Sequence, residues 1–310
     1  MALGTQSIGR RGKLAFRMVA MDMPAQAAEP GQLVPLGHTE LYVESHGEGE
    51  PLLLVAGLGG VGRFWSRQVA PFAEHFRVIT HDHRGVGRSG PGPLISNAGE
   101  MADDLLRLMD KLGLESAHLV GHSTGGAIGQ HIALRAPERL RSLVLSASWA
   151  GPTPLFVQTF RTRRDVLINC GPLNYLMVGT LLAMPAWALS KEFSDANTYL
   201  HSRLAQFPGL EVELGRLNAV MSHDLRHQVS AIRTPTFVIG AHDDQLTPPN
   251  LSQELAERIP GARLHLLEEG GHFCPHTVTD RYNAAVLDFL KSQQGENLSW
   301  PNKSSVSHMR

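Results

Sequence analysis

The sequence is poor in cysteine and has almost no excess of charge of either sign. Two cysteines, Cys170 and Cys274, occur in 310 residues, which is too few for a disulfide framework and favours a reducing compartment. Lysine and arginine number 28 against 29 aspartates and glutamates, so the formal net charge is −1. Without a basic surplus, nothing favours binding to nucleic acid or to an anionic membrane. We therefore expect a cytoplasmic protein, a monomer or homodimer, that acts on a small molecule.

No segment is predicted to cross a membrane, which takes roughly 18 to 20 consecutive apolar residues. Disorder is excluded for most of the chain, because 42% of the residues are hydrophobic and only 18% are charged. Residues 1–32 are set apart, since four basic residues precede the first acid, Asp22. They are predicted to be a disordered leader, with a cleaved export signal as the alternative.

Short apolar runs without polar alternation recur along the chain, and such runs are typical of strands buried on both faces. Two strands, 33–36 and 41–43, open the domain, and the buried runs follow at 51–56, 76–80, 118–120, 143–145, 236–239 and 264–267. Helical stretches such as 101–112 and 127–136 lie between them. Alternating strands and helices imply parallel pairing with helices on both faces. The predicted fold class is therefore α/β, with a doubly wound, mostly parallel sheet of eight strands.

One segment, residues 151–230, contains no buried strand and is predicted to be a helical lid inserted between strands 6 and 7. The flanking segments 33–150 and 231–290 would form the core, and 291–310 a polar, frayed tail. Within the lid, Arg161, Arg163 and Arg164 are interpreted as a solvated helix face. The alternative is that one of them binds a substrate carboxylate.

The sharpest local signal is the string Gly121-His122-Ser123-Thr124-Gly125 between a buried strand and a helix. A strand-to-helix turn this tight strains its central residue and brings neighbouring backbone very close, so glycines are needed on either side. Ser123 would then project from the tip of the turn. A serine hydroxyl becomes a good nucleophile only when a base takes its proton and an acid orients that base.

Candidates for both partners follow two later strands. Asp243 and Asp244 come after the strand at 236–239, and His272 comes after the strand at 264–267. Open α/β sheets place their functional sites at these carboxyl ends. The chain order of serine, acid and histidine is the one expected for a nucleophile on such a turn.

Four motifs together resemble the α/β-hydrolase family over residues 33–290. They are Gly57-Leu58-Gly59-Gly60, the segment Asp82 to Ser89, the turn at Ser123, and Asp244-Gln-Leu-Thr247-Pro-Pro ahead of Gly270-Gly271-His272. The resemblance implies that Ser123 is the nucleophile, Asp244 the acid, with Asp243 as the alternative, and His272 the base. It also implies an oxyanion hole formed by the backbone amides of Leu58 and Thr124.

One position departs from the common pattern of the family, because Ala56 stands where many members have a histidine. Since a backbone amide holds the oxyanion, we expect activity to survive this difference. Four further residues, Trp65, His122, Trp149 and Phe273, are predicted to bind substrate, although His122 is interpreted mainly as a packed residue of the turn. No metal site is expected, at His81 and His83 or elsewhere.

Within the family, the chain is similar to aminoacrylate or carbamate hydrolases of pyrimidine degradation and, more distantly, to enol-lactone hydrolases. The resembling segments are 57–65, 216–224 and 270–274. The resemblance implies a serine hydrolase that cleaves an ester, lactone or amide-type C–O or C–N bond through an acyl-enzyme, without a cofactor. The alternatives are a hydrolase of C–C bonds in dienoic diketones, a non-catalytic signal receptor, and an accompanying perhydrolase activity.

Overall fold

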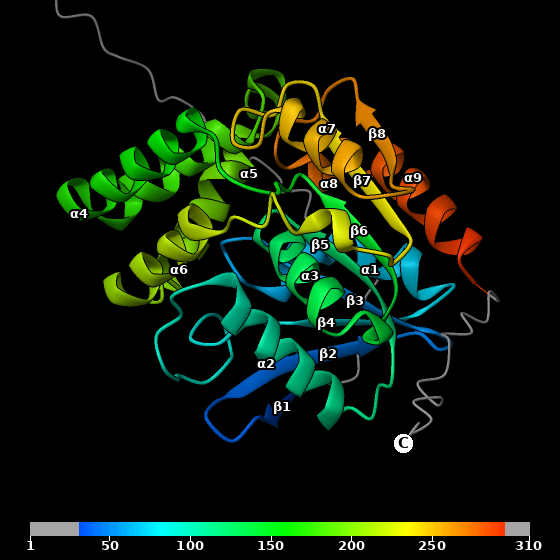
Figure 1. Cartoon of the computed structure of the whole chain (residues 1–310). Helices are drawn as coiled ribbons and strands as arrows, with labels where there is room; N and C mark the ends of the chain where they lie inside the picture. The colour runs from blue at the N-terminus through cyan, green and yellow to red at the C-terminus, as the bar shows by residue number, and fades with distance from the viewer. Residues whose placement is uncertain (1–30, 295–310) are drawn as a thin grey trace, which may run out of the picture.

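An eight-stranded sheet with helices on both faces forms the body of the protein (Figure 1). The computed structural model describes residues 31–294, apart from the side chains of residues 192–199. The strands are β1 (Gln32–Pro35), β2 (Glu40–His46), β3 (Pro51–Val55), β4 (Arg77–His81), β5 (Ala117–His122), β6 (Leu140–Ser146), β7 (Thr236–Ala241) and β8 (Arg263–Leu267). Their order across the sheet is β1-β2-β4-β3-β5-β6-β7-β8. The pairs β1–β2 and β2–β4 are antiparallel and the remaining pairs are parallel, which confirms the predicted mostly parallel sheet.

Helices connect these strands. They are α1 (Ser66–Ala73), α2 (Ala98–Lys111), α3 (Thr124–Arg135), α4 (Pro154–Ala183), α5 (Ala186–Ala205), α6 (Leu210–Ser222), α7 (Pro249–Arg258), α8 (Cys274–Thr277) and α9 (Thr279–Ser292). Short 3₁₀ turns are η1 (Gly62–Trp65), η2 (Pro137–Arg139) and η3 (Val229–Ala231).

Strand β3 shows why its sequence is a continuous apolar run. Successive side chains of a strand point to opposite faces. Leu53 and Val55 therefore pack in the cluster shared with α2, α3 and α7, and Leu52 and Leu54 pack in the cluster shared with α1 and α9. Because helices cover both faces, no position along the strand is left for a polar residue.

The helices α4, α5 and α6 lie between β6 and β7 in the chain, as the predicted insertion requires. Figure 1 shows them gathered at one end of the molecule. They share an apolar cluster of their own, which includes Phe156, Tyr175 and Leu217 and extends to Leu246 after β7. We refer to α4–α6 as the helical insertion.

Helix α4 corrects one prediction. By length and composition alone it could cross a membrane, and residues 166–190 contain no charged side chain. In the structure the backbone at Gly171 leaves the helical range, with φ of 80°, and Pro172 follows, so α4 consists of two helices across a kink. The expectation that no segment is long and apolar enough was wrong, whereas the expected absence of a membrane contact stays a prediction.

Both ends of the chain run past the described residues. The predicted leader lies almost entirely outside them, and β1 already begins at Gln32. Helix α9 continues to Ser292, two residues into the predicted tail. The segment 295–310 lies outside the described residues.

Candidate active site

Ser123 lies at the tip of the turn that joins β5 to α3. Its φ of 54° and ψ of −114° place it in a region that non-glycine residues rarely adopt. A Cβ atom at Gly121 would lie 2.2 Å from the carbonyl oxygen of Gly125, and one at Gly125 would lie 2.2 Å from that of Val55. Both glycines are therefore required by close backbone approach, as the sequence pattern predicts.

His272 and Asp244 meet at the carboxyl edge of the sheet. The Nδ1 atom of His272 lies 2.9 Å from Oδ2 of Asp244, and both side chains are buried. The other carboxylate oxygen accepts hydrogen bonds from the backbone N–H groups of Leu246 and Thr247, at 2.8 and 2.9 Å. Because Nδ1 donates to the carboxylate, Nε2 is the ring nitrogen available to accept a proton.

Asp243 has a different environment. Its Oδ1 accepts a hydrogen bond of 2.7 Å from the backbone N–H of Gly271 and thereby anchors the loop that carries His272. Of the two carboxylates left open by the sequence, the structure pairs Asp244 with the histidine.

Thr247 is a site residue to which sequence reasoning assigned no role. Its hydroxyl lies 2.6 Å from Oδ2 of Asp244, 3.1 Å from Nδ1 of His272 and 3.1 Å from the carbonyl oxygen of Ala147. The hydroxyl thus fixes the carboxylate against β6 and β7. The signal was present in the sequence, since Thr247 belongs to the motif that singled out Asp244.

The loop after β3 is held by a residue of the helical insertion. Arg216 of α6 is fully buried, and its Nε and Nη2 atoms donate to the carbonyl oxygen of Leu58 at 2.9 and 2.7 Å. The same Nη2 lies 3.2 Å from Nδ1 of His83. Thr124, on the other side of the predicted oxyanion hole, is the first residue of α3, where backbone N–H groups have no partner within the helix.

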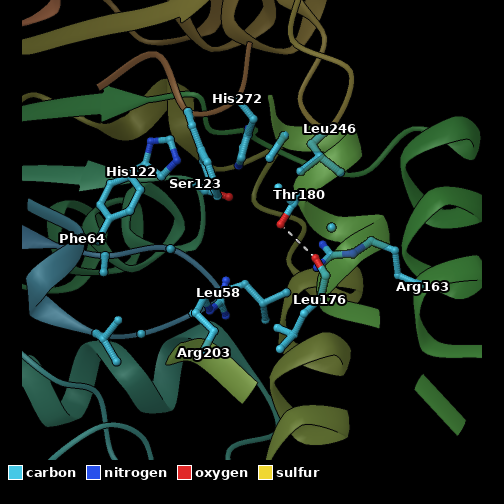
Figure 2. Close-up of a pocket in the computed structure, with 18 of the residues that line it drawn as sticks. Leu58, Phe64, His122, Ser123, Arg163, Leu176, Thr180, Arg203, Leu246 and His272 are labelled. Atoms are coloured by element: carbon cyan, nitrogen blue, oxygen red, sulfur yellow. Dashed lines mark hydrogen bonds between the residues drawn. The ribbon is translucent and has the colours of Figure 1, made fainter. Parts of the chain in front are cut away.

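A cavity of about 740 Å³, including space open to solvent at its mouth, contains these groups. Ser123, His272 and the backbone of the β3 loop, from Ala56 to Val61, line one side. Residues of the helical insertion line the other, and Figure 2 shows Arg163, Leu176 and Thr180 on that side. The cavity is therefore bounded by the nucleophile turn, the β3 loop and the helical insertion.

Two of the predicted substrate-binding residues line this cavity and two do not. His122 and Phe273 lie in its wall. Trp65 and Trp149 are completely buried and absent from the lining, which corrects the prediction. Trp65 packs edge-on against Phe64 at 5.0 Å, so that Phe64 takes the place at the cavity.

Trp149 is packed within the apolar cluster of the insertion instead. Its ring lies 4.8 Å from Phe156 and 5.5 Å from His223. Its large side chain therefore joins the insertion to the sheet.

His122 packs behind the nucleophile turn. Its ring stacks on Phe64 at 4.8 Å and lies 4.8 Å from that of His272, and its Nδ1 lies 3.2 Å from the hydroxyl of Ser146. Burial, and then the neighbouring His272 and His276, hold the pKa of His122 well below its ordinary value. His122 is thus a neutral packed ring at pH 7.

The insertion brings charged side chains to its side of the cavity, namely Arg163, Arg203 and Glu213. The hydroxyl of Tyr175 donates to Glu213 at 2.5 Å. Burial and the Glu213 carboxylate raise the pKa of Tyr175, so its proton is retained. Sequence reasoning had interpreted Arg163 as solvent-exposed, yet it is 8% exposed.

Cys274, His81 at the end of β4 and the neighbouring His83 take no part in the cavity wall. Burial raises the pKa of the Cys274 thiol well above its ordinary value, so it is a poor nucleophile. Among the described side chains, those of residues 31–191 and 200–294, no group of three or more His, Cys, Asp or Glu is arranged to hold a metal ion.

Comparisons with known proteins agree with this architecture. The model of the α/β hydrolase fold family matches residues 50–277. A protein of Azorhizobium caulinodans named carbamate hydrolase RutD is 37% identical over 253 residues, covering 82% of this chain and 96% of the relative. A protein of the same name from Pseudomonas savastanoi pv. phaseolicola is 38% identical over 256 residues, covering 82% and 98%.

Among solved structures, the enol-lactonase from Burkholderia xenovorans LB400 superposes with a TM-score of 0.75 and 26% identity, covering 84% of this chain and all of the other. Both resemblances inferred from the motifs, to carbamate hydrolases and to enol-lactone hydrolases, are confirmed. The chain belongs to the α/β hydrolase fold family, as an enzyme of the hydrolase class.

Proposed function

We propose that the protein is a serine hydrolase that cleaves a C–O or C–N bond of a small ester, lactone, amide or carbamate through an acyl-enzyme. One observation carries the proposal. The strained Ser123 and the Asp244-bonded His272 line the same cavity, although they come from the ends of three different strands. A nucleophile, its base and the acid that orients the base are the minimal set for acyl transfer.

In the first half of the reaction, Oγ of Ser123 attacks the substrate carbonyl carbon while Nε2 of His272 takes the hydroxyl proton. The C–Oγ bond forms and the carbonyl oxygen becomes an oxyanion. His272 then passes its proton to the leaving alcohol or amine as the C–O or C–N bond breaks. Asp244 holds Nδ1 and stabilises the imidazolium ion.

In the second half, a water molecule gives a proton to His272 and attacks the acyl carbon. Collapse of this intermediate returns the proton to Ser123 and releases the acid. The backbone N–H groups of Leu58 and Thr124 would bind the oxyanion in both halves. No step requires a cofactor.

The relatives sharpen the choice of substrate. Since the curated relatives at 37% and 38% identity are named carbamate hydrolases, we include a carbamate C–N bond among the bonds cleaved.

The test is steady-state hydrolysis of 4-nitrophenyl esters, from acetate to octanoate, and of small carbamates, with wild type beside Ser123→Ala. We expect kcat to fall by roughly 10⁴ to 10⁶ in the variant, because the three residues act as a unit. The ester chain length that gives the highest kcat/KM measures the reach of the cavity.

Multiple turnovers per enzyme molecule would exclude the signal-receptor alternative. An unchanged rate in Ser123→Ala would overturn the proposal. Turnover of a dienoic diketone in the absence of ester and carbamate turnover would replace it with the C–C hydrolase.

A further inference from the structure

Arg163 is a buried cation on the insertion side of the cavity. It is 8% exposed, whereas its neighbour Arg161 is exposed and Arg164 pairs with Asp165 at 3.2 Å. In Figure 2 the side chain of Arg163 extends from α4 toward the cavity, which it lines together with Ser123.

No hydrogen bond or ion pair holds the Arg163 guanidinium within the described part of the chain, and its Nε is buried without a partner. Its contacts are the faces of two aromatic rings, Phe160 at 5.2 Å and Tyr175 at 4.9 Å. Gly179 leaves space for it, since a Cβ atom there would lie 2.8 Å from Nη2 of Arg163. The site is therefore shaped around a guanidinium whose donors are unused.

The surrounding charges do not neutralise Arg163. Glu213 is the acidic side chain in the described cavity wall, and it accepts the hydroxyl of Tyr175 at 2.5 Å rather than pairing with Arg163. The guanidinium of Arg163 is therefore available to pair with an anionic ligand.

A buried guanidinium without an anion is unfavourable, and its planar fork of N–H donors matches a carboxylate in a bidentate pair. We propose that Arg163 binds a carboxylate of the substrate, so that the substrate class is a small carboxylate-bearing ester, amide or carbamate. Reaction and recognition are then divided, with the scissile carbonyl at Ser123 and the carboxylate at the helical insertion. This inference rests on the proposed function for the identity of the scissile bond but not for the anion site.

The first experiment measures binding without turnover. Succinate, glutarate and adipate are titrated by calorimetry into Ser123→Ala, beside the matching uncharged diamides. We expect one of the dicarboxylates to bind at least tenfold more tightly than its diamide. Adding Arg163→Gln to the Ser123→Ala protein should reduce that preference by about 10- to 100-fold, the effect of losing a charge-assisted pair.

Arg161→Gln is the matched control, because it removes an exposed guanidinium two residues away on the same helix. It should leave the dicarboxylate preference unchanged. Arg163→Lys keeps the charge without the planar fork and should fall between wild type and Arg163→Gln. Thermal unfolding midpoints of all variants verify that each protein is folded.

The second experiment uses activity. The kcat/KM ratio of 4-nitrophenyl hydrogen glutarate to 4-nitrophenyl butyrate is compared between wild type and Arg163→Gln. We expect the ratio to fall by about 10- to 100-fold, through KM.

Equal binding of dicarboxylates and diamides, or a preference that survives in folded Arg163→Gln, would overturn the anion site. If esters are nevertheless turned over, the anion site is wrong but the proposed serine hydrolase function is retained. An Arg163-dependent dicarboxylate preference with no turnover of any ester or carbamate would instead overturn the proposed function alone.

Discussion

The two walls of the cavity are built differently. On the sheet wall, the carboxylate of Asp244 is fully hydrogen-bonded, because it accepts from Leu246, Thr247 and His272. On the insertion wall, Arg163 has ring faces beside it but no anion. A group that must keep one geometry through a reaction gains from saturated hydrogen bonding, whereas a group that binds substrate needs donors left over. Under the proposed function, the sheet wall would perform the chemistry and the insertion wall would select the substrate.

The largest predicted effect distinguishes the two neighbouring acids, Asp243 and Asp244, when each is changed separately to asparagine. Asp244→Asn should lower kcat by about 10³ to 10⁴, because an amide stabilises the imidazolium poorly and favours the wrong ring tautomer. Asp243→Asn should change kcat less than threefold, since its amide oxygen can still accept from the N–H of Gly271. Kinetics with a 4-nitrophenyl ester measures both, and a larger loss in Asp243→Asn would refute the assignment of the acid.

A second prediction concerns Arg216, a residue of the insertion that contacts the sheet wall. Arg216→Ala removes both donors to the carbonyl oxygen of Leu58, so the predicted oxyanion loop should shift and kcat should fall by about 10²-fold. KM should change less than kcat, because the oxyanion exists only after attack. Arg216→Lys, which keeps one donor, should recover part of the loss.

A merely structural role for Arg216 would give a different pattern. The thermal unfolding midpoint would drop while kcat per folded molecule stayed at the wild-type value. That outcome would mean that Arg216 of the insertion does not contribute to kcat. The proposed chemistry would then depend on the sheet wall alone.

A third prediction concerns how the stability of the fold depends on pH. The histidines near the cavity lie on its sheet side, and His276 is one of them. His276 packs against Phe64 at 4.7 Å, and burial together with Arg67 lowers its pKa to about 4. The unfolded chain, with a histidine pKa of about 6.5, then binds more protons than the folded one below that pH. Stability is therefore lost as the pH falls from about 6.5 toward 4, and His276 alone costs about 2 kcal/mol at pH 5.

The measurement is the free energy of unfolding in urea at pH 7 and pH 5. His276→Gln should lose less stability than wild type over this interval. His75→Gln is the control, because His75 is exposed, and it should show the wild-type dependence. An identical pH dependence in wild type and His276→Gln would contradict the lowered pKa of His276.

The sheet side could be predicted from the sequence because its signals are local. A buried strand followed by a glycine-flanked serine defines a turn by steric necessity, and the register of parallel strands brings their ends to one edge. Strand ends were predicted to within three residues, for example 143–145 against Leu140–Ser146. Predicting which single side chain reaches the cavity requires knowledge of the packing around it, which the local sequence does not contain. Phe64 and Trp65 are adjacent, yet only Phe64 reaches the cavity.

The insertion side was predicted poorly for a related reason. Its helical character and its place in the chain follow from the absence of strands, but which face of α4 is buried depends on how the insertion docks. Arg163 therefore resembled its exposed neighbours in sequence, and Arg216 gave no sign of reaching Leu58 across 158 positions. The uncharged stretch 166–190 was misjudged as well, since its apolar length is interrupted in the structure by the backbone at Gly171 and again where α4 ends at Ala183.

The smallest predicted effect tests whether saturated bonding matters on the sheet wall. Thr247→Val keeps the shape of the side chain and removes the hydroxyl that lies 2.6 Å from Asp244 and 3.1 Å from His272. One lost hydrogen bond to a charged group corresponds to about a tenfold fall in kcat, and Thr247→Ser should restore it. In an Asp244→Asn background, Thr247→Val should lower kcat little further, because the hydroxyl acts through that carboxylate. A full additional tenfold loss in the double variant would mean that Thr247 acts on His272 directly, and the carboxylate would then be only one of two groups that orient the base.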